Sequence, residues 1–524
     1  MPGTAPAQFQ AMDEREVELK LRLRAQDLAA LRSRLDALGA AARTERVDSV
    51  YYDTPDLRLA SGKAALRLRS IGEGRTRRWL QTFKTQDSAA ALSVRGEWER
   101  PAPGGRIDLR SLADSPLAQM LDGAPRAPRP RATGELLASL RPVFRTVFDR
   151  CAWDLALEGA HIEAVIDAGE IQAGGRSEPI CEAELELRAG PHSAILDLAL
   201  ALAGATGRRH ADLSLLPYGE SKAARGYRLA LGRGPMPFAA GFSRLPQAFT
   251  PQQRVAGAAR QLVALGMTAL LANAAEFADS ANPEFVHQAR VAIRRMRAGL
   301  DLLGAQAEVP PALLHSLRTW AGRFGAVRDW DVLCTEQLPP LAAAASGGSA
   351  ASWTRVCELA AKRRNGARTR LGRQLAEPAF AEFALRALRW SAGVPARPGK
   401  RLADFARKAV RARQRRLAVA ARSFARLPAE RQHKIRIQAK GLRYGIEMLQ
   451  ASLPKRIRRG ALLGLTRFQD AAGSARDALL VQLAVARLTR SAAIRRQVQQ
   501  WAQSRQSTAI GKAQRLAAYL KPAR

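Results

Sequence analysis

Cysteines, aromatic residues and long apolar runs are all scarce in this chain of 524 residues. The four cysteines stand far apart, with no pair at zinc-ligand spacing, so the sequence predicts neither a disulfide scaffold nor a zinc site and favours a reducing compartment. The apolar stretch 194–205 contains an aspartate and is too short to cross a bilayer. The first residues show no basic segment followed by an apolar core, so we expect a cytoplasmic protein that has no membrane partner.

Acidic residues are scarce in one half of the chain only. Residues 1–240 hold 34 lysines and arginines against 31 acidic residues, whereas residues 241–524 hold 50 against 16. The formal net charge of +37 therefore lies almost wholly in the second half, which predicts a polyanionic partner. Nucleic acid is disfavoured as that partner, because aromatic residues make up only 6% of the chain and no DNA- or RNA-binding signature is present.

The pattern of the chain predicts two domains. Residues 13–230 mix alternating segments with a few helical ones, residues 231–250 form a linker rich in Gly and Pro, and residues 251–520 are helical in character. The helical part contains a repeat, because the segment that begins at His287 matches the segment at His433, and Gly325 to Asp329 matches Gly473 to Asp477. We therefore expect two similar helical bundles, at about 251–345 and 400–520.

Charged side chains recur at every second position in the alternating segments. Side chains on a strand alternate between its two faces, so Glu16, Glu18 and Lys20 share one face while Val17 and Leu19 take the other. The same pattern is found at Arg67 and Arg69, Thr82 and Lys84, Arg95, Glu97 and Glu99, Glu163 and Asp167, and Glu182, Glu184 and Glu186.

Any one such strand fits an antiparallel sheet with one solvated face. The series as a whole favours a charged face that lines the inside of a closed or nearly closed sheet. A lining with both signs suits a polyphosphate with Mg²⁺ or Mn²⁺, because carboxylates bind these hard cations while arginine and lysine bind phosphate oxygens. For Asp167, a turn position is an equally good interpretation.

Residues 13–230 resemble the CYTH superfamily of triphosphate tunnel enzymes. The resemblance rests on the Glu16-x-Glu18-x-Lys20 signature and on motifs that follow the family's order, at 52–56, 62–69, 81–84, 95–99, 148–153, 180–186 and 221–227. It implies an eight-stranded antiparallel tunnel and metal-dependent hydrolysis of a triphosphate. Family members include inorganic triphosphatases, thiamine triphosphatases and adenylyl cyclases.

The resemblance also implies roles for individual residues. The divalent cations would be bound by Glu16, Glu18, Glu182, Glu184 and Glu186, of which Glu186 is at the edge of the pattern. The triphosphate would be bound by Lys20, Arg67, Arg69, Lys84, Arg95, Arg150 and Lys222. Glu97 and Glu99 would help to hold metal or orient water, which places them with Glu16, Glu18 and Lys20 in the catalytic set.

Each copy of the helical repeat predicts a cationic stripe beside an apolar one. In the first copy the polar stripe is His287, Arg290, Arg294 and Arg297, and in the second it is His433, Arg436, Lys440 and Arg443. Steps of three and four residues put each set on one helix face. A solvated face is the simpler explanation for one helix, but like charges at these spacings repel, so a duplicated stripe predicts an anionic ligand.

These two segments resemble the motifs of the CHAD domain, over roughly 250–520. The resemblance implies binding of inorganic polyphosphate by a basic groove and recruitment to polyphosphate granules. The histidines fit a hydrogen-bonded or phosphate-contacting role better than metal binding. The repeated Gly-x-x-Arg-Asp segments suggest helix starts or caps first and arginine–phosphate contacts second.

The sequence therefore predicts an antiparallel β tunnel or barrel of α+β class, followed by an all-α domain of two duplicated four-helix bundles. The favoured function is hydrolysis of inorganic tripolyphosphate with Mg²⁺ or Mn²⁺ in the first domain and polyphosphate binding by the second. The alternatives are a granule-associated scaffold with little turnover, a thiamine triphosphatase or an adenylyl cyclase.

Overall fold

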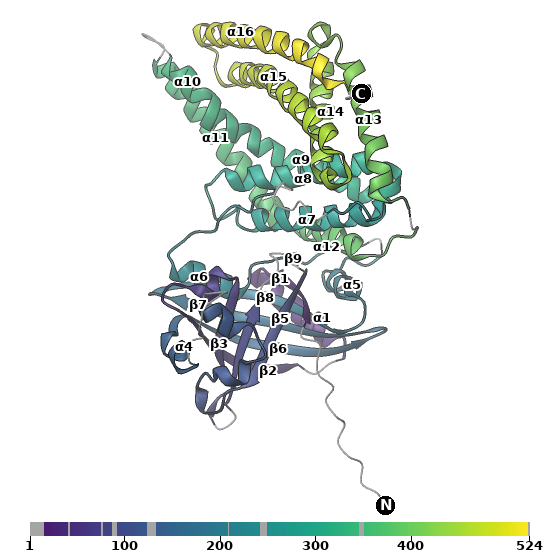
Figure 1. The fold of residues 1–524 in the computed structure, drawn as a ribbon. Helices are drawn as coiled ribbons and strands as arrows, with labels where there is room; N and C mark the ends of the chain where they lie inside the picture. Colours follow the sequence, from purple (N-terminus) through teal and green to yellow (C-terminus); the bar gives the residue numbers. More distant parts are fainter. Residues whose placement is uncertain are drawn as a thin grey trace, which may run out of the picture. The chain divides into compact units, whose positions relative to one another are not determined.

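The computed structural model describes residues 15–39, 42–74, 77–85, 92–122, 133–207, 209–240, 249–344, 350–397 and 399–521. These residues form two compact units (Figure 1). The first unit is residues 1–236 with 377–385, and the second is residues 237–376 with 386–524. The inclusion of 377–385 in the first unit is a feature that the sequence does not predict.

The first unit is built on one antiparallel sheet that closes on itself, which confirms the predicted fold class. Strand β1 pairs with β8 on one side and with β5 on the other, and the intervening order is β5-β4-β3-β2-β6-β7-β8. A short strand, β9, also pairs with β1. The strands are β1 (Arg15–Arg22), β2 (Arg43–Asp53), β3 (Ala64–Ile71), β4 (Arg78–Thr85), β5 (Leu92–Pro101), β6 (Arg141–Leu157), β7 (Ala160–Ala173), β8 (Arg176–Ala189) and β9 (Leu216–Pro217).

The register of the sheet places the charged positions of neighbouring strands side by side. Lys20 is opposite Glu184, and Arg22 is opposite Glu182. Across the next pair of strands, Asp167 is opposite both Glu182 and Arg150. Because facing residues in a sheet share a face, the alternation seen in separate segments becomes one continuous charged surface.

The other face of the sheet is apolar and lies under short helices. The helices of this unit are α1 (Leu28–Asp36), α2 (Arg58–Ser61), α3 (Leu117–Asp122), α4 (Thr133–Ser139), α5 (His192–Leu202) and α6 (Lys222–Ala230). Leu66 and Phe83, from β3 and β4, are fully buried in a cluster with Leu121 of α3 and Leu136 of α4. This packing turns the apolar face away from water and leaves the charged face inside the closed sheet.

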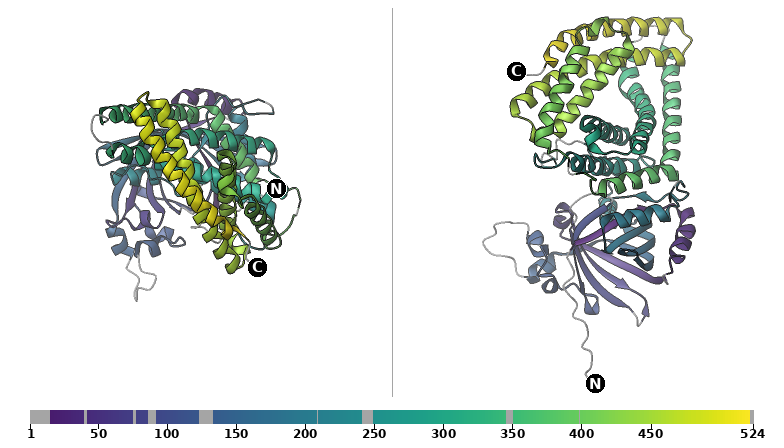
Figure 2. Two further views of the ribbon diagram at one scale, coloured as in Figure 1. Left: turned by 90° about the horizontal axis from the view of Figure 1, so that it is seen from above. Right: turned by 90° about the vertical axis from the view of Figure 1, so that its right-hand side faces the viewer.

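The second unit is helical and duplicated. Its helices are α7 (Val255–Ala275), α8 (Glu284–Leu303), α9 (Pro311–Val332), α10 (Leu338–Ala343), α11 (Ala350–Ala376), α13 (Leu402–Ala420), α14 (Ala429–Met448), α15 (Lys455–Leu488) and α16 (Ala492–Leu516). Helix α12 (Pro378–Ala392) begins in the first unit and ends in the second. The helices α7, α8 and α9 correspond in order to α13, α14 and α15. Figure 2 shows the helices of this unit in teal through green to yellow. The residues before α7 and α13, Arg254 and Arg401, form an isolated β-bridge, so the two copies also begin side by side.

The apolar stripes that the repeat predicts are buried. Val286, Ile293 and Met296 of α8 are fully buried, as are Ala439 and Ile446 of α14. The polar stripes lie at the neighbouring positions of the same two helices, so the helix and its buried face are as predicted.

One helix of the described chain, α7, is long and apolar enough to cross a membrane, with a mean hydropathy of 1.5. Within its most apolar window 67% is buried inside the structure, which is typical of the core helix of a bundle. The sequence interpretation singled out 194–205, which is the shorter helix α5, and missed this longer apolar segment.

Candidate functional site

Three carboxylates meet on the inner face of the closed sheet. Asp167 of β7 and Glu182 and Glu184 of β8 place ligand oxygens within 4.8 Å of one another. Asp167 and Glu182 are 0% and 2% exposed, so the sheet removes both from water. Carboxylate oxygens at this separation are a fitting donor set for a hard divalent cation such as Mg²⁺ or Mn²⁺. Two of the predicted metal ligands, Glu182 and Glu184, thus belong to one acidic cluster.

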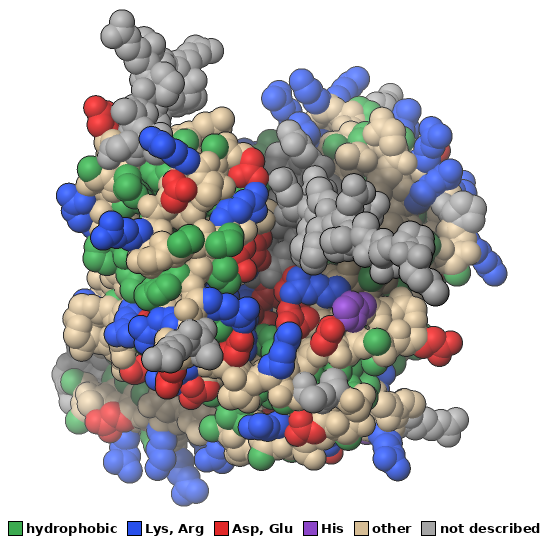
Figure 3. All heavy atoms as spheres, turned by 90° about the horizontal axis from the view of Figure 1, so that it is seen from below, with side chains coloured by type: hydrophobic (Ala, Val, Ile, Leu, Met, Phe, Trp, Pro, Cys, Tyr) green, Lys and Arg blue, Asp and Glu red, His purple; other side chains and the backbone are tan. Residues whose placement is uncertain are grey.

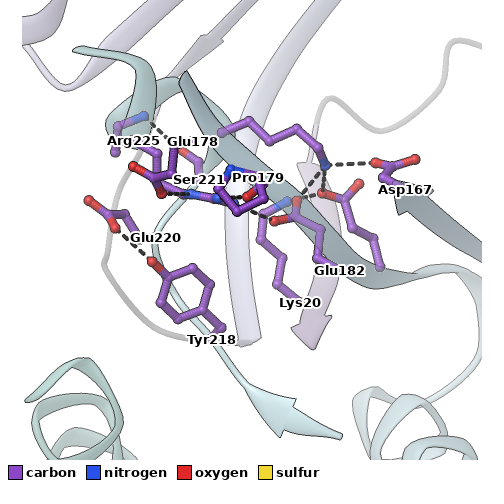
Figure 4. Close-up of polar contacts among 12 residues, drawn as sticks. Lys20, Asp167, Glu178, Pro179, Glu182, Tyr218, Glu220, Ser221 and Arg225 are labelled. Atoms are coloured by element: carbon purple, nitrogen blue, oxygen red, sulfur yellow. Dashed lines mark hydrogen bonds and ion pairs between the residues drawn. The ribbon is translucent and has the colours of Figure 1, made fainter. Parts of the chain in front are cut away.

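Two lysines neutralise this cluster. The Lys222 ammonium lies 2.6 Å from Asp167 Oδ2 and 3.0 Å from Glu184 Oε1, and it also contacts Glu182. The Lys20 ammonium lies 2.5 Å from Glu18 Oε1 and contacts Glu184. Figure 4 shows Lys20, Asp167 and Glu182 turned toward one another from separate strands. Both lysines come from predicted positions.

The pKa shifts of Glu184 and Lys222 show that the neighbouring opposite charges outweigh the effect of burial. Burial alone would raise the pKa of Glu184, but Lys20, Lys222 and Arg150 outweigh it and hold that pKa well below its usual range. Burial would likewise lower the pKa of Lys222, yet Asp167, Glu182 and Glu184 raise it. The Glu184 carboxylate therefore remains ionised at neutral pH, as a metal ligand must be.

Arg150 connects the acidic cluster to a cationic one. Its guanidinium donates two hydrogen bonds to Asp167, with Nε–Oδ1 at 2.8 Å and Nη2–Oδ2 at 2.7 Å. It also lies close enough to Arg69 to lower that residue's pKa by repulsion. Arg150 thus stands between the carboxylates of β7 and β8 and the arginines of β3.

Arg69 of β3 is buried beside other cations, and the nearby Glu99 offsets their repulsion only in part. Arg69 is 8% exposed, and its Nε has no hydrogen-bond partner among the described residues. Burial first, and then repulsion from Arg67 and Arg150, lowers the pKa of Arg69 to about 10. A buried cation beside other cations is costly unless an anion joins it, so this part of the inner face suits an anionic ligand.

Glu97, Glu99 and Lys84 lie on the cationic side and outside the acidic cluster. Lys84 Nζ is 2.6 Å from Glu97 Oε2, and Arg67 is 3.8 Å from the other oxygen of that carboxylate. Glu99, whose side chain is exposed, accepts a hydrogen bond of 3.0 Å from Thr82. From these positions Glu97 and Glu99 can orient the neighbouring cations and water. They lie outside the group of Asp167, Glu182 and Glu184 that is suited to a metal.

The remaining predicted residues of the first unit fall in three places. Glu186 pairs with Arg188 and is not among the three clustered carboxylates. Glu18 is 1% exposed and bound to Lys20, beside the cluster. Glu16 and Arg95 lie opposite each other in the β1–β5 register, but their side chains lie outside the described residues.

Sequence reasoning missed or misplaced three residues of this site. Asp167 lies inside β7, so its interpretation as a turn residue is wrong. Arg225 of α6 binds Glu182 at 3.0 Å and Glu178 at 2.7 Å, and its spacing of three from Lys222 on a helix was the available signal. Tyr51 is 3% exposed, and the nearby cations lower its pKa although burial would raise it. Its position in a strand of apolar and polar residues gave no sign of this.

A second concentration of positive charge lies where α8 and α14 of the helical unit pack together. Leu302 of α8 lies over Gly445 of α14, and Arg295 pairs with Glu447 at 3.2 Å. We call Arg290, Arg294, Arg436 and Lys440 the cationic cluster. Burial and repulsion from Arg294, Arg436, Arg290 and Arg443 lower the pKa of Lys440 to about 7, which places these side chains close together.

The other predicted residues of the two stripes surround this cluster unevenly. Burial and then Arg328 lower the pKa of His287, while burial and then Arg476 lower the pKa of His433. Arg443 donates to Glu447 at 2.7 Å and is partly neutralised. Arg297 is exposed and is repelled by a different neighbour, Arg318.

The repeated glycines have a different role from the predicted one. Gly325 lies inside α9 and Gly473 lies inside α15, so the prediction of a helix start or cap is wrong at both positions. An added Cβ at Gly325 would be 2.5 Å from Arg290 Nη1, and one at Gly473 would be 3.5 Å from Arg436 Nε. Each glycine thus lets an arginine of the neighbouring helix lie across its backbone.

Comparison with known proteins assigns both units. Residues 14–226 match the CYTH domain family, and residues 261–487 match the CHAD domain family. The chain is a CYTH–CHAD protein. The CYTH domain carries the closed sheet with its acidic cluster, and the CHAD domain carries the cationic cluster.

Individual relatives cover parts of this CYTH–CHAD chain. It is 32% identical over 143 residues to an inorganic triphosphatase of Haemophilus influenzae, a match that spans 27% of this chain and 36% of that protein. The CHAD domain from the plant Ricinus communis is 23% identical, with a TM-score of 0.44, over 56% of this chain and 98% of that one. A putative adenylyl cyclase from Hippeastrum, described as having a dominant triphosphatase activity, is 21% identical, with a TM-score of 0.27, over 42% of this chain and 96% of that one.

The CYTH match and the Haemophilus relative support a triphosphate-hydrolysing role for the CYTH domain in broad terms. Members of this family use divalent metals, and the acidic cluster is a fitting place for one. Figure 3 shows that acidic and basic side chains are intermixed on the face of the molecule seen from below.

Proposed function

We propose that the CYTH domain hydrolyses inorganic tripolyphosphate with Mg²⁺ or Mn²⁺, and that the CHAD domain binds long-chain polyphosphate. The observation that supports the first half is the junction of an acidic cluster with buried arginines, of which Arg69 is repelled by Arg67 and Arg150. Asp167, Glu182 and Glu184 are suited to a divalent cation, while Arg67 and Arg69 are suited to phosphate oxygens. Arg150 contacts the acidic side and faces the cationic side.

The chemistry requires mostly positioning and neutralisation of charge. In hydrolysis, an oxygen of water forms a bond to the terminal phosphorus, and the bond from that phosphorus to the bridging oxygen breaks. The bound cation would polarise phosphate oxygens and water. Arg67 and Arg69 would hold the phosphate chain in line, and Lys20 and Lys222 would turn from their carboxylates toward the added negative charge.

The proposal is tested by comparing substrates on the full chain. We expect orthophosphate release from tripolyphosphate to exceed release from ATP and from thiamine triphosphate at equal concentration. A clear preference for thiamine triphosphate, or formation of cyclic AMP from ATP, would favour the other activities found in this family.

Polyphosphate binding by the CHAD domain is supported by the cationic cluster. The four cations come from both repeats and are partly buried, so their repulsion is relieved only when an anion neutralises them. Recruitment to polyphosphate granules and a cytoplasmic location remain predictions from the sequence. A scaffold role, in which the CYTH domain binds but does not turn over, would give saturable polyphosphate binding without phosphate release.

The affinity for polyphosphate should fall as the pH rises from 6 to 9. Lys440 has a pKa of about 7 in the ligand-free protein, so it is charged below that value and loses its proton above it. The groups that face it are His287, Arg290 and Arg294 of α8, Arg436 and Arg443 of α14, and Asp477 of α15. Bound polyanion favours the charged form, so binding near pH 7.5 should take up a proton.

Calorimetric titration in buffers of different ionisation enthalpy measures that proton directly. Lys440→Arg should remove most of the proton uptake near pH 7.5, because arginine keeps its charge. An affinity that does not depend on pH in the native protein would contradict this role for Lys440.

Alanine at the two repeated glycines should have unequal effects. Gly325→Ala should displace the Arg290 guanidinium and weaken polyphosphate binding by about three- to tenfold, the loss expected for one disturbed charged contact. Gly473→Ala meets Arg436 only at ordinary contact distance and should change binding by less than about twofold.

Both glycine variants should fold, since Gly→Ala inside a helix stabilises by about 0.5–1 kcal/mol where space permits. Thermal unfolding provides that control. Equal losses of affinity, or a larger loss in Gly473→Ala, would show that the crossing of Arg290 over Gly325 is unimportant for binding.

A further inference from the structure

The two repeats of the CHAD domain supply matched sets of one histidine and two arginines. The first set is His287, Arg290 and Arg328, and the second is His433, Arg436 and Arg476. In each set the histidine and the first arginine come from α8 or α14, while the second arginine comes from α9 or α15. The proximity of the second arginine to the histidine is visible in both sets, because it lowers the histidine's pKa.

The first set is partly neutralised by a carboxylate of its own repeat. Arg328 Nη2 lies 3.0 Å from Glu336 Oε1, and the Arg328 side chain is only 18% exposed. Glu336 belongs to the π-helical segment Leu333–Gln337, which follows α9 directly. A wider helical turn at this point changes the direction of the side chains that follow it, and here it accompanies the contact between Glu336 and Arg328.

The second set has no corresponding carboxylate. The 148-residue offset that relates Arg328 to Arg476 relates Glu336 to Ala484, and the neighbours of Ala484, Leu483 and Val485, are also uncharged. α15 continues through this region as an α-helix. Both sets keep one weaker carboxylate contact of equal length, Arg290 to Asp329 at 3.8 Å and Arg436 to Asp477 at 3.9 Å, so the difference lies at Glu336.

Three donor atoms of the second set make no hydrogen bond to the described residues. His433 Nδ1, Arg436 Nε and Arg476 Nε are all buried and make no hydrogen bond to any described residue. Among the described residues, no side-chain atom of His287, Arg290 or Arg328 is both buried and without a hydrogen bond. A cleft of about 280 Å³ adjoins Arg436 and is also lined by Gln469, Ser474 and Arg505 and by two carboxylates, Asp470 and Asp477. Buried donors without acceptors beside a polar cleft are suited to phosphate oxygens.

We propose that the two repeats bind phosphate unequally: His433, Arg436 and Arg476 form the stronger subsite, and Glu336 weakens the subsite of His287, Arg290 and Arg328. The inference rests on the proposed binding of polyphosphate. It adds that the second-repeat side of the cationic cluster anchors the polyphosphate chain. In the first subsite a phosphate must compete with a carboxylate already bound to Arg328. In the second it meets donors that nothing has satisfied.

The test is a matched set of variants of the full chain, titrated calorimetrically with polyphosphate of defined length at fixed salt. Arg476→Ala should weaken binding about tenfold or more, and Arg328→Ala should weaken it less than about threefold, because only Arg476 loses an uncompensated charged contact. Glu336→Gln should strengthen binding about two- to fivefold, the range expected when an exposed ion pair is removed.

The double variant makes the test specific. In the Glu336→Gln background, Arg328→Ala should cost clearly more affinity than it does alone, since Arg328 is then free to bind phosphate. Equal losses for Arg328→Ala and Arg476→Ala, or no gain from Glu336→Gln, would overturn the inequality. If the native chain does not bind polyphosphate at all, the proposed function of the CHAD domain fails instead.

Discussion

Glu184→Gln should reduce the hydrolysis of tripolyphosphate by at least about 100-fold, because this carboxylate contacts both lysines that neutralise the acidic cluster and also Arg150. It lies within ion-pair distance of Lys20, Lys222 and Arg150, and it is one of the three carboxylates that can share a cation. The amide keeps the shape but removes the negative charge, so the site would hold a divalent cation more weakly. Steady-state phosphate release at several metal concentrations measures the loss.

Asp149→Asn is the matched control for Glu184→Gln. Asp149 is the sequence neighbour of Arg150, but it lies on the outer face of β6, where it is exposed and pairs with Arg46. Exposed ion pairs of this kind contribute about 0–1 kcal/mol to stability, so activity and unfolding should hardly change. Equal activity of Glu184→Gln and the native protein would show that the acidic cluster is not the metal-binding part of the site.

Arg69→Met should stabilise the ligand-free protein while weakening tripolyphosphate binding strongly. Arg69 is buried beside Arg67 and Arg150, and its pKa of about 10 shows that the folded state disfavours its charge. Removing that charge should therefore raise the free energy of unfolding, by about 1–2 kcal/mol. The sign agrees with linkage: a base whose pKa falls on folding destabilises the folded state at every pH below its folded pKa.

The same variant would remove a phosphate ligand of the proposed site. KM for tripolyphosphate should rise by about tenfold or more, and protection against unfolding by added tripolyphosphate should largely disappear. Thermal unfolding with and without tripolyphosphate measures both effects in one experiment. A destabilised Arg69→Met protein would contradict the view that Arg69 is kept for its ligand and not for the fold.

The sequence predicted the inner face of the CYTH domain well because a strand has a fixed period of two. Once Glu18 and Lys20 are on one face, the alternation alone places Glu182 and Glu184 on a comparable face of their own strand. The prediction of the buried stripes of α8 and α14 succeeded for a similar reason, since helical spacing is local.

The predictions were wrong or incomplete where pairing between distant segments decides the outcome. The alternation with Glu163 left a turn and a charged strand face equally open for Asp167, and only its register between Arg150 and Glu182 decides for the strand face. Gly325 looked like a helix end because glycine is common there, whereas its actual role depends on Arg290 of another helix. Glu336 could be understood only once the π-helical segment brought it to Arg328.

The proposed hydrolysis depends most on carboxylates and cations that act together on one small phosphate anion. Orthophosphate release from tripolyphosphate, measured on the full chain with Mg²⁺, with Mn²⁺ and with the metal chelated, tests this most directly. We predict many turnovers per protein molecule with at least one of the two metals and essentially none after chelation. Turnover that persists unchanged after chelation, or the absence of turnover with either metal, would contradict the proposed function of the acidic cluster.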